Sequence, residues 1–249
     1  METPAPAPGV KARLDISSIL SRSFAIMLER PGIFLVLALI SWLPSLAVDL
    51  FIPDTAAGKV GLAVLVDFLL GMVIEGAIAY ATFYALKGLP FTMGDSLSVG
   101  LAKVGSIVLA AILVGIGVLL GTILLIIPGI IIYCMLAVTI QACVVEDLGA
   151  IDSLKRSADL TRGYRWPIFG LVLLVSIGGG LVVGFISGFG VGFSASSGTQ
   201  TPIIITTVMA NAVGVVITAF ASIMYSIIYF DLRCLKEGLS LDSLTAVFD

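Results

Sequence analysis

Residues 104–145 read VGSIVLAAILVGIGVLLGTILLIIPGIIIYCMLAVTIQACVV, and this stretch decides the fold. It contains no charged side chain, although Lys103 and Glu146 flank it directly. A single helix of that length would extend about 63 Å at 1.5 Å per residue, whereas the hydrocarbon core of a bilayer is about 30 Å thick. Pro128-Gly129 is a strong turn signal. We therefore predict a hairpin of two membrane spans, Val104–Ile126 and Gly129–Val145.

The rest of the chain has the same apolar character. Of its 249 residues, 59% are hydrophobic and 12% are charged, against roughly 25% charged residues in soluble domains. This composition cannot coat a water-soluble globule. Further apolar segments of spanning length are Gly32–Ile52, Gly61–Leu86, Pro167–Gly192 and Ile203–Phe230. We predict an all-α bundle of six transmembrane helices, with residues 14–249 as a single membrane domain and residues 1–13 as a disordered cytoplasmic tail.

The basic residues test this count and orient the bundle. Six spans place twelve of the thirteen Lys and Arg residues on one side, and Lys59 alone on the other. The positive-inside rule makes the basic side cytoplasmic. We predict a multi-pass protein of the prokaryotic inner membrane with both termini in the cytoplasm. The outer connections would be short, namely residues 53–60, the Pro-Gly turn and residues 193–202.

A short motif recurs in the cytoplasmic segments. The tripeptide Asp-Ser-Leu occurs at 95–97, 152–154 and 242–244, and Asp15 opens the similar stretch DISSIL. Because Asp is a good N-cap, each is expected to start a helix. The helices starting at Asp15 and Asp152 are amphipathic and should lie at the membrane interface, the first turning into the bilayer at Pro31. This predicts three repeated units of interfacial helix, span out and span back; a common cap without a repeat is the alternative.

Composition also excludes several kinds of chemistry. The chain has no histidine, which excludes Ser-His-Asp and Cys-His catalysis and removes the commonest catalytic zinc ligand. The three cysteines form no CxxC motif, so we expect no metal site and no disulfide. No basic patch with interleaved aromatic residues points to nucleic acid. We expect no catalytic residues and no cofactor.

Two carboxylates lie inside the second span. Asp67 and Glu75 share one half of the helix, and charges within a span are functional candidates because they are costly there. They could form a ligand or transport pathway, with Asn211 as a further polar group. Alternatively, Glu75 is structural and bonded to Asn211, Gln141 or a hydroxyl. In either case it should face the bundle interior.

Two further groups of residues are candidates for packing or lipid contact. Gly180, Gly184, Gly188 and Gly192 form a stripe that would let another helix approach closely, either within the chain or in a homodimer, and Gly117 and Gly121 form a shorter one. Glu146 at a helix C-terminus needs a cationic partner, and Arg156, Arg162 and Arg165 are near in sequence. These arginines, with Asp231 and Arg233, form either structural ion pairs or a site for lipid phosphate.

The stretch from Leu124 to Trp166 resembles a signature of prokaryotic membrane proteins similar to the membrane domain of some glycerophosphodiester phosphodiesterases. The likeness is carried by Ile127-Pro128-Gly129, Val145-Glu146, Leu154 to Ser157, Leu160 to Gly163 and Tyr229 to Arg233. It implies a six-span fold. Phosphodiesterase activity does not follow, because the catalytic module of that family is a separate domain with acidic and histidine ligands.

These observations favour a non-enzymatic inner-membrane protein that organises or assists partners, either lipids or a membrane complex. Short loops, interfacial helices and the lack of catalytic groups support this hypothesis. A small transporter or permease using Asp67 and Glu75 is the alternative. A polar cavity reaching Glu75 would favour the second hypothesis.

Overall fold

The computed structural model describes residues 14–51, 59–199 and 201–238, and within these ranges every regular element is a helix. The predicted tail 1–13 and the tripeptide at 242–244 lie outside them. The ten helices, in order, are α1 (Ile16–Glu29), α2 (Pro31–Phe51), α3 (Lys59–Leu86), α4 (Met93–Ala102), α5 (Val104–Leu124), α6 (Ile126–Met135), α7 (Thr139–Val145), α8 (Ala150–Thr161), α9 (Arg165–Ser197) and α10 (Thr201–Glu237). The predicted all-helical fold is confirmed.

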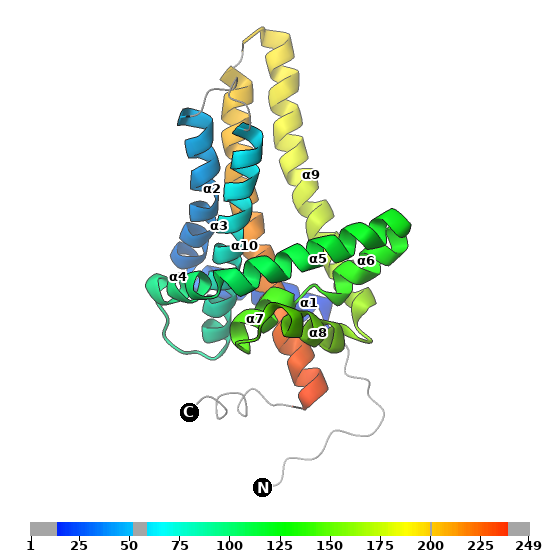
Figure 1. Ribbon diagram of the computed structural model, residues 1–249. Coiled ribbons are helices and arrows are strands. Elements are labelled where there is room, and N and C mark those ends of the chain that lie inside the picture. The colour runs from blue at the N-terminus through cyan, green and yellow to red at the C-terminus, as the bar shows by residue number, and fades with distance from the viewer. Residues whose placement is uncertain (1–13, 52–58, 200, 239–249) are drawn as a thin grey trace.

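The long helices fall into two sets by direction. Helices α2, α3, α9 and α10 stand side by side, and the hairpin of α5 and α6 lies across them near their lower end (Figure 1). Five segments are long and apolar enough to cross a membrane, and a sixth is added if the bent pair α1–α2 is one span. The described chain is thus a polytopic helical membrane bundle of five to six candidate spans.

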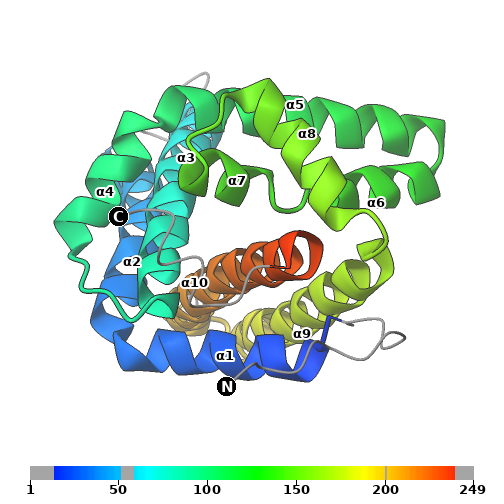
Figure 2. The same ribbon diagram turned by 90° about the horizontal axis from the view of Figure 1, so that it is seen from below.

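The short helices gather at one end of this bundle. Helices α1, α4, α7 and α8 lie at the lower end in Figure 1, and from below α1, α4 and α8 surround the end of α10 (Figure 2). Each of these three precedes a long helix and a helical return, which is the order that the repeat predicts. Between α1 and α2 the axis bends by 94°. The predicted turn at Pro31 is therefore present, with Asp15 capping α1 through the backbone N–H of Ser17.

The other two Asp-Ser-Leu tripeptides are not N-caps. Thr92 caps α4, and Asp95 lies three residues further on, where its carboxylate closes a capping box. Gly149 precedes α8, and Asp152 again lies in the first turn. The predicted cap positions were wrong by three residues, because an acid in the first turn stabilises the same helix end through the helix dipole. Ser96 and Ser153, next in each tripeptide, are both buried.

The fourth predicted span is not a continuous helix. It ends as α6 at Met135 and restarts as α7 at Thr139, so Cys134 and Cys143 lie on different helices. The backbone groups released at this break bond to hydroxyls of α8. Ser157 donates to the carbonyl of Met135 and accepts from the N–H of Val138 (3.0 and 3.3 Å), and Thr161 also donates to Met135 (3.0 Å). Buried protein partners allow such a break at membrane depth.

The predicted outer connection at residues 193–202 is mostly helical. Helix α9 continues to Ser197 and ends at Gly198, whose φ of 67° is left-handed and suits glycine. At 33 residues, α9 is about 50 Å long. Its length exceeds the hydrocarbon thickness of about 30 Å, so a tilt or a protruding end is required.

The glycine stripe of α9 does not pack against the residues that the structure describes. A Cβ placed on Gly180, Gly184, Gly188 or Gly192 would meet no described atom within 4 Å. The side facing α10 instead carries Gly179 and Gly190, where a Cβ would meet Ile217 at 3.1 Å and Thr206 far inside contact distance. The predicted intrachain role of the stripe was wrong, because adjacent helical positions differ by about 100° in direction. Whether a second copy packs there stays a prediction.

The closest approaches of one helix backbone to another are elsewhere. A Cβ on Gly100 of α4 would lie 2.4 Å from the carbonyl oxygen of Val73 in α3, and one on Gly121 would lie 3.0 Å from the Cα of Gly129. The second contact confirms half of the shorter stripe and closes the predicted hairpin of α5 and α6. The predicted position of the turn was wrong: the chain turns at Leu125, and Pro128 and Gly129 lie in the first turn of α6, where proline is tolerated. The first contact joins α3 to α4 where the sequence showed no glycine pattern.

Candidate functional site

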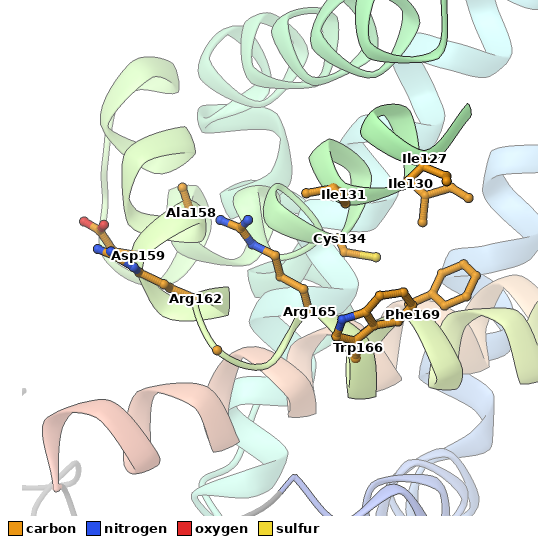
Figure 3. A pocket seen from close by; sticks show the side chains of 11 residues that line it. Ile127, Ile130, Ile131, Cys134, Ala158, Asp159, Arg162, Arg165, Trp166 and Phe169 are labelled. Carbon is orange, nitrogen blue, oxygen red and sulfur yellow. The ribbon is translucent and has the colours of Figure 1, made fainter. Parts of the chain in front are cut away.

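A pocket of about 810 Å³ lies where α6, α8 and the start of α9 meet. Asp159 lines it from α8, Arg162 from the turn that follows and Arg165 from the first position of α9. The apolar lining comes mainly from α6 and α9. Figure 3 shows the charged side chains toward one side of the pocket and the isoleucines and aromatic rings toward the other. The full lining is Ile127, Ile130, Ile131, Cys134, Ala158, Asp159, Arg162, Gly163, Arg165, Trp166 and Phe169.

The chain places these arginines through a tight turn. Helix α8 ends at Thr161, Gly163 adopts a left-handed φ of 93°, and α9 begins at Arg165. Trp166 then stands 78% exposed beside the opening, with its ring edge-on to Phe169. An exposed Trp at the start of a long apolar helix suits the headgroup layer of a membrane.

Neither pocket arginine forms an ion pair with the residues that the structure describes, although the carboxylate of Asp159 lines the same pocket. No ion pair or side-chain hydrogen bond joins Arg162 or Arg165 to the residues that the structure describes. The Nε of Arg165 is buried and has no partner among them. A buried donor without an acceptor costs about 1–3 kcal/mol or more. The pocket therefore offers two cationic groups and an orphaned N–H to an anionic oxygen.

Glu146 pairs with another arginine. Arg156 donates from Nε to both carboxylate oxygens (2.8 and 2.9 Å), and Tyr229 donates its hydroxyl to one of them (2.5 Å). Of the three predicted partners, the structure thus selects Arg156, and it places Arg162 and Arg165 in the pocket instead. The pair joins α8 to α7, as expected for an ion pair that holds the short helix in place.

This ion pair belongs to a larger network at the end of α10. Glu237 bonds to both Arg156 and Arg233, the latter at 2.8 Å, and Arg233 lies 3.9 Å from Glu146. Burial acts to lower the pKa of Arg156, but its bonds to Glu237 and Glu146 outweigh this and raise that pKa overall. Asp231 separately pairs with Arg22 of α1. Asp231 thus links α10 to α1, and Arg233 pairs with Glu146 and Glu237, which both bind Arg156 of α8.

The intramembrane carboxylates behave differently from each other. Glu75 points into the bundle and accepts hydrogen bonds from Gln141 of α7 (3.1 Å) and Ser222 of α10. Asp67 joins no part of this cluster, and its Oδ1 is buried without a partner in the described chain. Asn211 does not bond to Glu75. The sequence expectation that Asp67, Glu75 and Asn211 act together receives no geometric support, whereas the predicted contact between Glu75 and Gln141 is present.

The sequence did not predict that α6 lines the arginine pocket. It also did not predict that Ser222 donates to Glu75. The isoleucines of α6 read as an ordinary span, and only the fold brings them beside α8. The available signal was the pair of arginines around the glycine at 163, directly before Trp166. That spacing marks a charged turn at a membrane surface.

The family described as a domain of unknown function, DUF7847, matches residues 86–232. This match covers more than half of the chain, and the protein belongs to that family. It spans α4 to α9 and most of α10, including the arginine pocket and Gln141, but not Glu75. No curated protein and no solved structure matches the chain.

Proposed function

We propose that this protein is a non-enzymatic, multi-pass protein of the prokaryotic inner membrane that binds anionic phospholipid headgroups and organises lipids or a membrane complex. The observation that carries the proposal is the pocket with two unpaired arginines and one orphaned N–H on its charged side. A lipid phosphate supplies the missing acceptors. The isoleucines and the rings of Trp166 and Phe169 suit the start of the acyl chains.

The orientation in the membrane is part of this proposal. Of the Lys and Arg residues that the structure describes, all except Lys59 lie in α1, α8, the first position of α9 or the end of α10, or in the short segments that flank α1, α4 and α8. By the positive-inside rule the end of the bundle where they lie is cytoplasmic, and both termini follow it. Reporter fusions at Lys11 and Asp249 should both report a cytoplasmic location, and a periplasmic signal from either would contradict the topology. The sequence resemblance to the membrane domain of glycerophosphodiester phosphodiesterases stays a prediction about the fold.

The lipid site can be tested by counting lipids bound to the purified protein. Native mass spectrometry after reconstitution with equal phosphatidylglycerol and phosphatidylcholine should show preferential retention of phosphatidylglycerol. Each arginine near a membrane surface contributes about 1 kcal/mol toward anionic lipid. The variant R162Q/R165Q should therefore lose most of that preference.

The matched control is Lys155→Gln. Lys155 lies on the same helix α8 and pairs with Asp152, but it does not line the pocket. K155Q removes one positive charge from the same membrane face and should keep the preference. Equal loss in both variants would indicate general surface electrostatics, and no loss in R162Q/R165Q would refute the site.

A further inference from the structure

A second pocket, of about 650 Å³, lies between α3, α5, the α6–α7 segment and α10. Its lining is mostly apolar, and its polar groups are few. Glu75, Gln141, Tyr133 and Tyr225 are among them. The two tyrosine hydroxyls are 2.6 Å apart. Few convergent polar groups in an apolar pocket are typical of small-molecule sites.

The carboxylate of Glu75 has donors but no counter-cation. The amide of Gln141 and the hydroxyl of Ser222 each donate to one of its oxygens. No Lys or Arg pairs with Glu75 among the residues that the structure describes. A charged carboxylate at this depth is costly without a positive partner. A cationic group placed beside this carboxylate would offset that cost.

Gln141 also has a buried acceptor without a donor. Its residue is 2% exposed, and its Oε1 is buried without a donor in the described chain. Nε2 of the same amide donates to Glu75, which leaves Oε1 as the free acceptor. Thr139 also lines the pocket, but its hydroxyl donates to the carbonyl of Leu136 and therefore does not donate to Oε1 of Gln141. A group with several N–H donors, placed beside Glu75, would supply a donor to Oε1 of Gln141 and a positive partner to the Glu75 carboxylate.

The shape and lining of the pocket narrow the class of donor. Phe68, Tyr133 and Tyr225 place three aromatic residues around it, and aromatic rings attract ammonium groups. Leu119, at 59% exposure, lies on an open side. A metal ion would need more oxygen ligands than one carboxylate and one amide, whereas an amine with an apolar tail needs only these contacts.

We propose that this pocket binds an organic ammonium group on an apolar tail, with the ammonium donating to Glu75 and to Oε1 of Gln141. The site is separate from the arginine pocket and takes a ligand of opposite charge. It is independent of the lipid-headgroup proposal, since either site can fail its test without affecting the other.

The test compares two probes of equal tail length, n-octylammonium and the neutral 1-octanol. Binding to the purified full chain in nanodiscs would be measured by calorimetry. The wild type should bind octylammonium at least tenfold more tightly than octanol. Charged hydrogen bonds support roughly a 10- to 100-fold loss on removing the carboxylate, so Glu75→Gln should bind both probes alike. Asp67→Asn, on the same helix but outside this pocket, should bind octylammonium like the wild type.

Gly115→Leu supplies a steric test that leaves the polar cluster intact. Gly115 lines the pocket, and a Cβ there meets nothing within 4 Å, so leucine should fold and fill the space. It should block octylammonium. Equal binding of the two probes by the wild type would overturn the proposal. So would retained octylammonium binding in a folded E75Q variant or, where E75Q does not fold, in G115L.

Discussion

Helices α10 and α9 are neighbours of similar length and hydropathy, yet the chain buries them very differently. Half of the apolar window of α10 is buried within the described protein, against 11% for α9 and 17% for α5. The difference follows from position, because α10 contacts α1, α2, α3, α7, α8 and α9, whereas α9 has α10 and α6 as its main contacts. Hydropathy therefore predicts that a helix is in the membrane, but not whether protein or lipid surrounds it.

The largest effect is expected from removing Glu146, which belongs to the ion-pair network at the end of α10. Glu146→Ala removes an acceptor of Arg156 and the acceptor of the Tyr229 hydroxyl, and it leaves Arg156 and Arg233 with Glu237 as their remaining acidic partner in the described chain. Breaking a buried ion pair costs about 3–5 kcal/mol, and the partial exposure of Arg156 puts the expected loss at about 3 kcal/mol. Unfolding of the purified protein in denaturant would measure it.

Asp152→Ala is the control for that loss. It also removes an acid that pairs with a basic residue, but its pair with Lys155 is exposed. The change should be within about 1 kcal/mol, as for other surface pairs. Similar losses in the two variants would show that the network at the end of α10 does not hold α8.

A smaller effect is expected where the backbones of α3 and α4 approach most closely. Gly100→Ala places a Cβ 2.4 Å from the backbone oxygen of Val73, so α4 must move away from α3. Overpacking of this kind costs about 1–3 kcal/mol. Gly105→Ala, where a Cβ meets nothing within 4 Å, should be neutral in the same thermal unfolding assay. A neutral G100A would mean that the two helices are not in close contact.

The smallest expected effect is a difference in stability between substitutions on the two sides of α9. Gly190→Ile faces Thr206 of α10 and should lower stability by about 1 kcal/mol, at the low end of overpacking because a side chain can move. Gly184→Ile, on the open stripe, should leave the monomer as stable as the wild type. Crosslinking in membranes adds a second readout: loss of a dimer in G184I alone would assign the stripe to a homodimer.

The sequence predicted the parts of this fold that depend on local properties. The α5–α6 hairpin, the bend at Pro31 and the pairing of Glu146 with an arginine close by in sequence all involve near neighbours in sequence or simple length limits. The direction of α5 and α6 could not be predicted, because apolarity carries no information on tilt. The break at residues 136–138 was equally hidden, since the hydroxyls that permit it come from α8.

The candidate sites divide in the same way. Arg162 and Arg165 were visible as basic residues beside Trp166. That neither pairs with Glu146 could not be predicted, because only the fold shows that Glu146 pairs with Arg156. Glu75 was visible as an acid in a span, and Gln141 as one of several candidate partners. The orphaned Oε1 of Gln141 and the contact with Ser222 require the fold, because 147 residues separate Glu75 from Ser222.

The helix break between α6 and α7 has a consequence for biogenesis. Ribosomes deliver α6 and α7 before α8, so the carbonyl of Met135 and the N–H of Val138 enter the bilayer before Ser157 and Thr161 exist. Unbonded backbone groups are costly in lipid. Residues 126–145 must therefore either begin as one unbroken helix that opens when α8 docks, or wait in the insertion machinery until it arrives. The α8 hydroxyls thus set an order of assembly as well as a final structure.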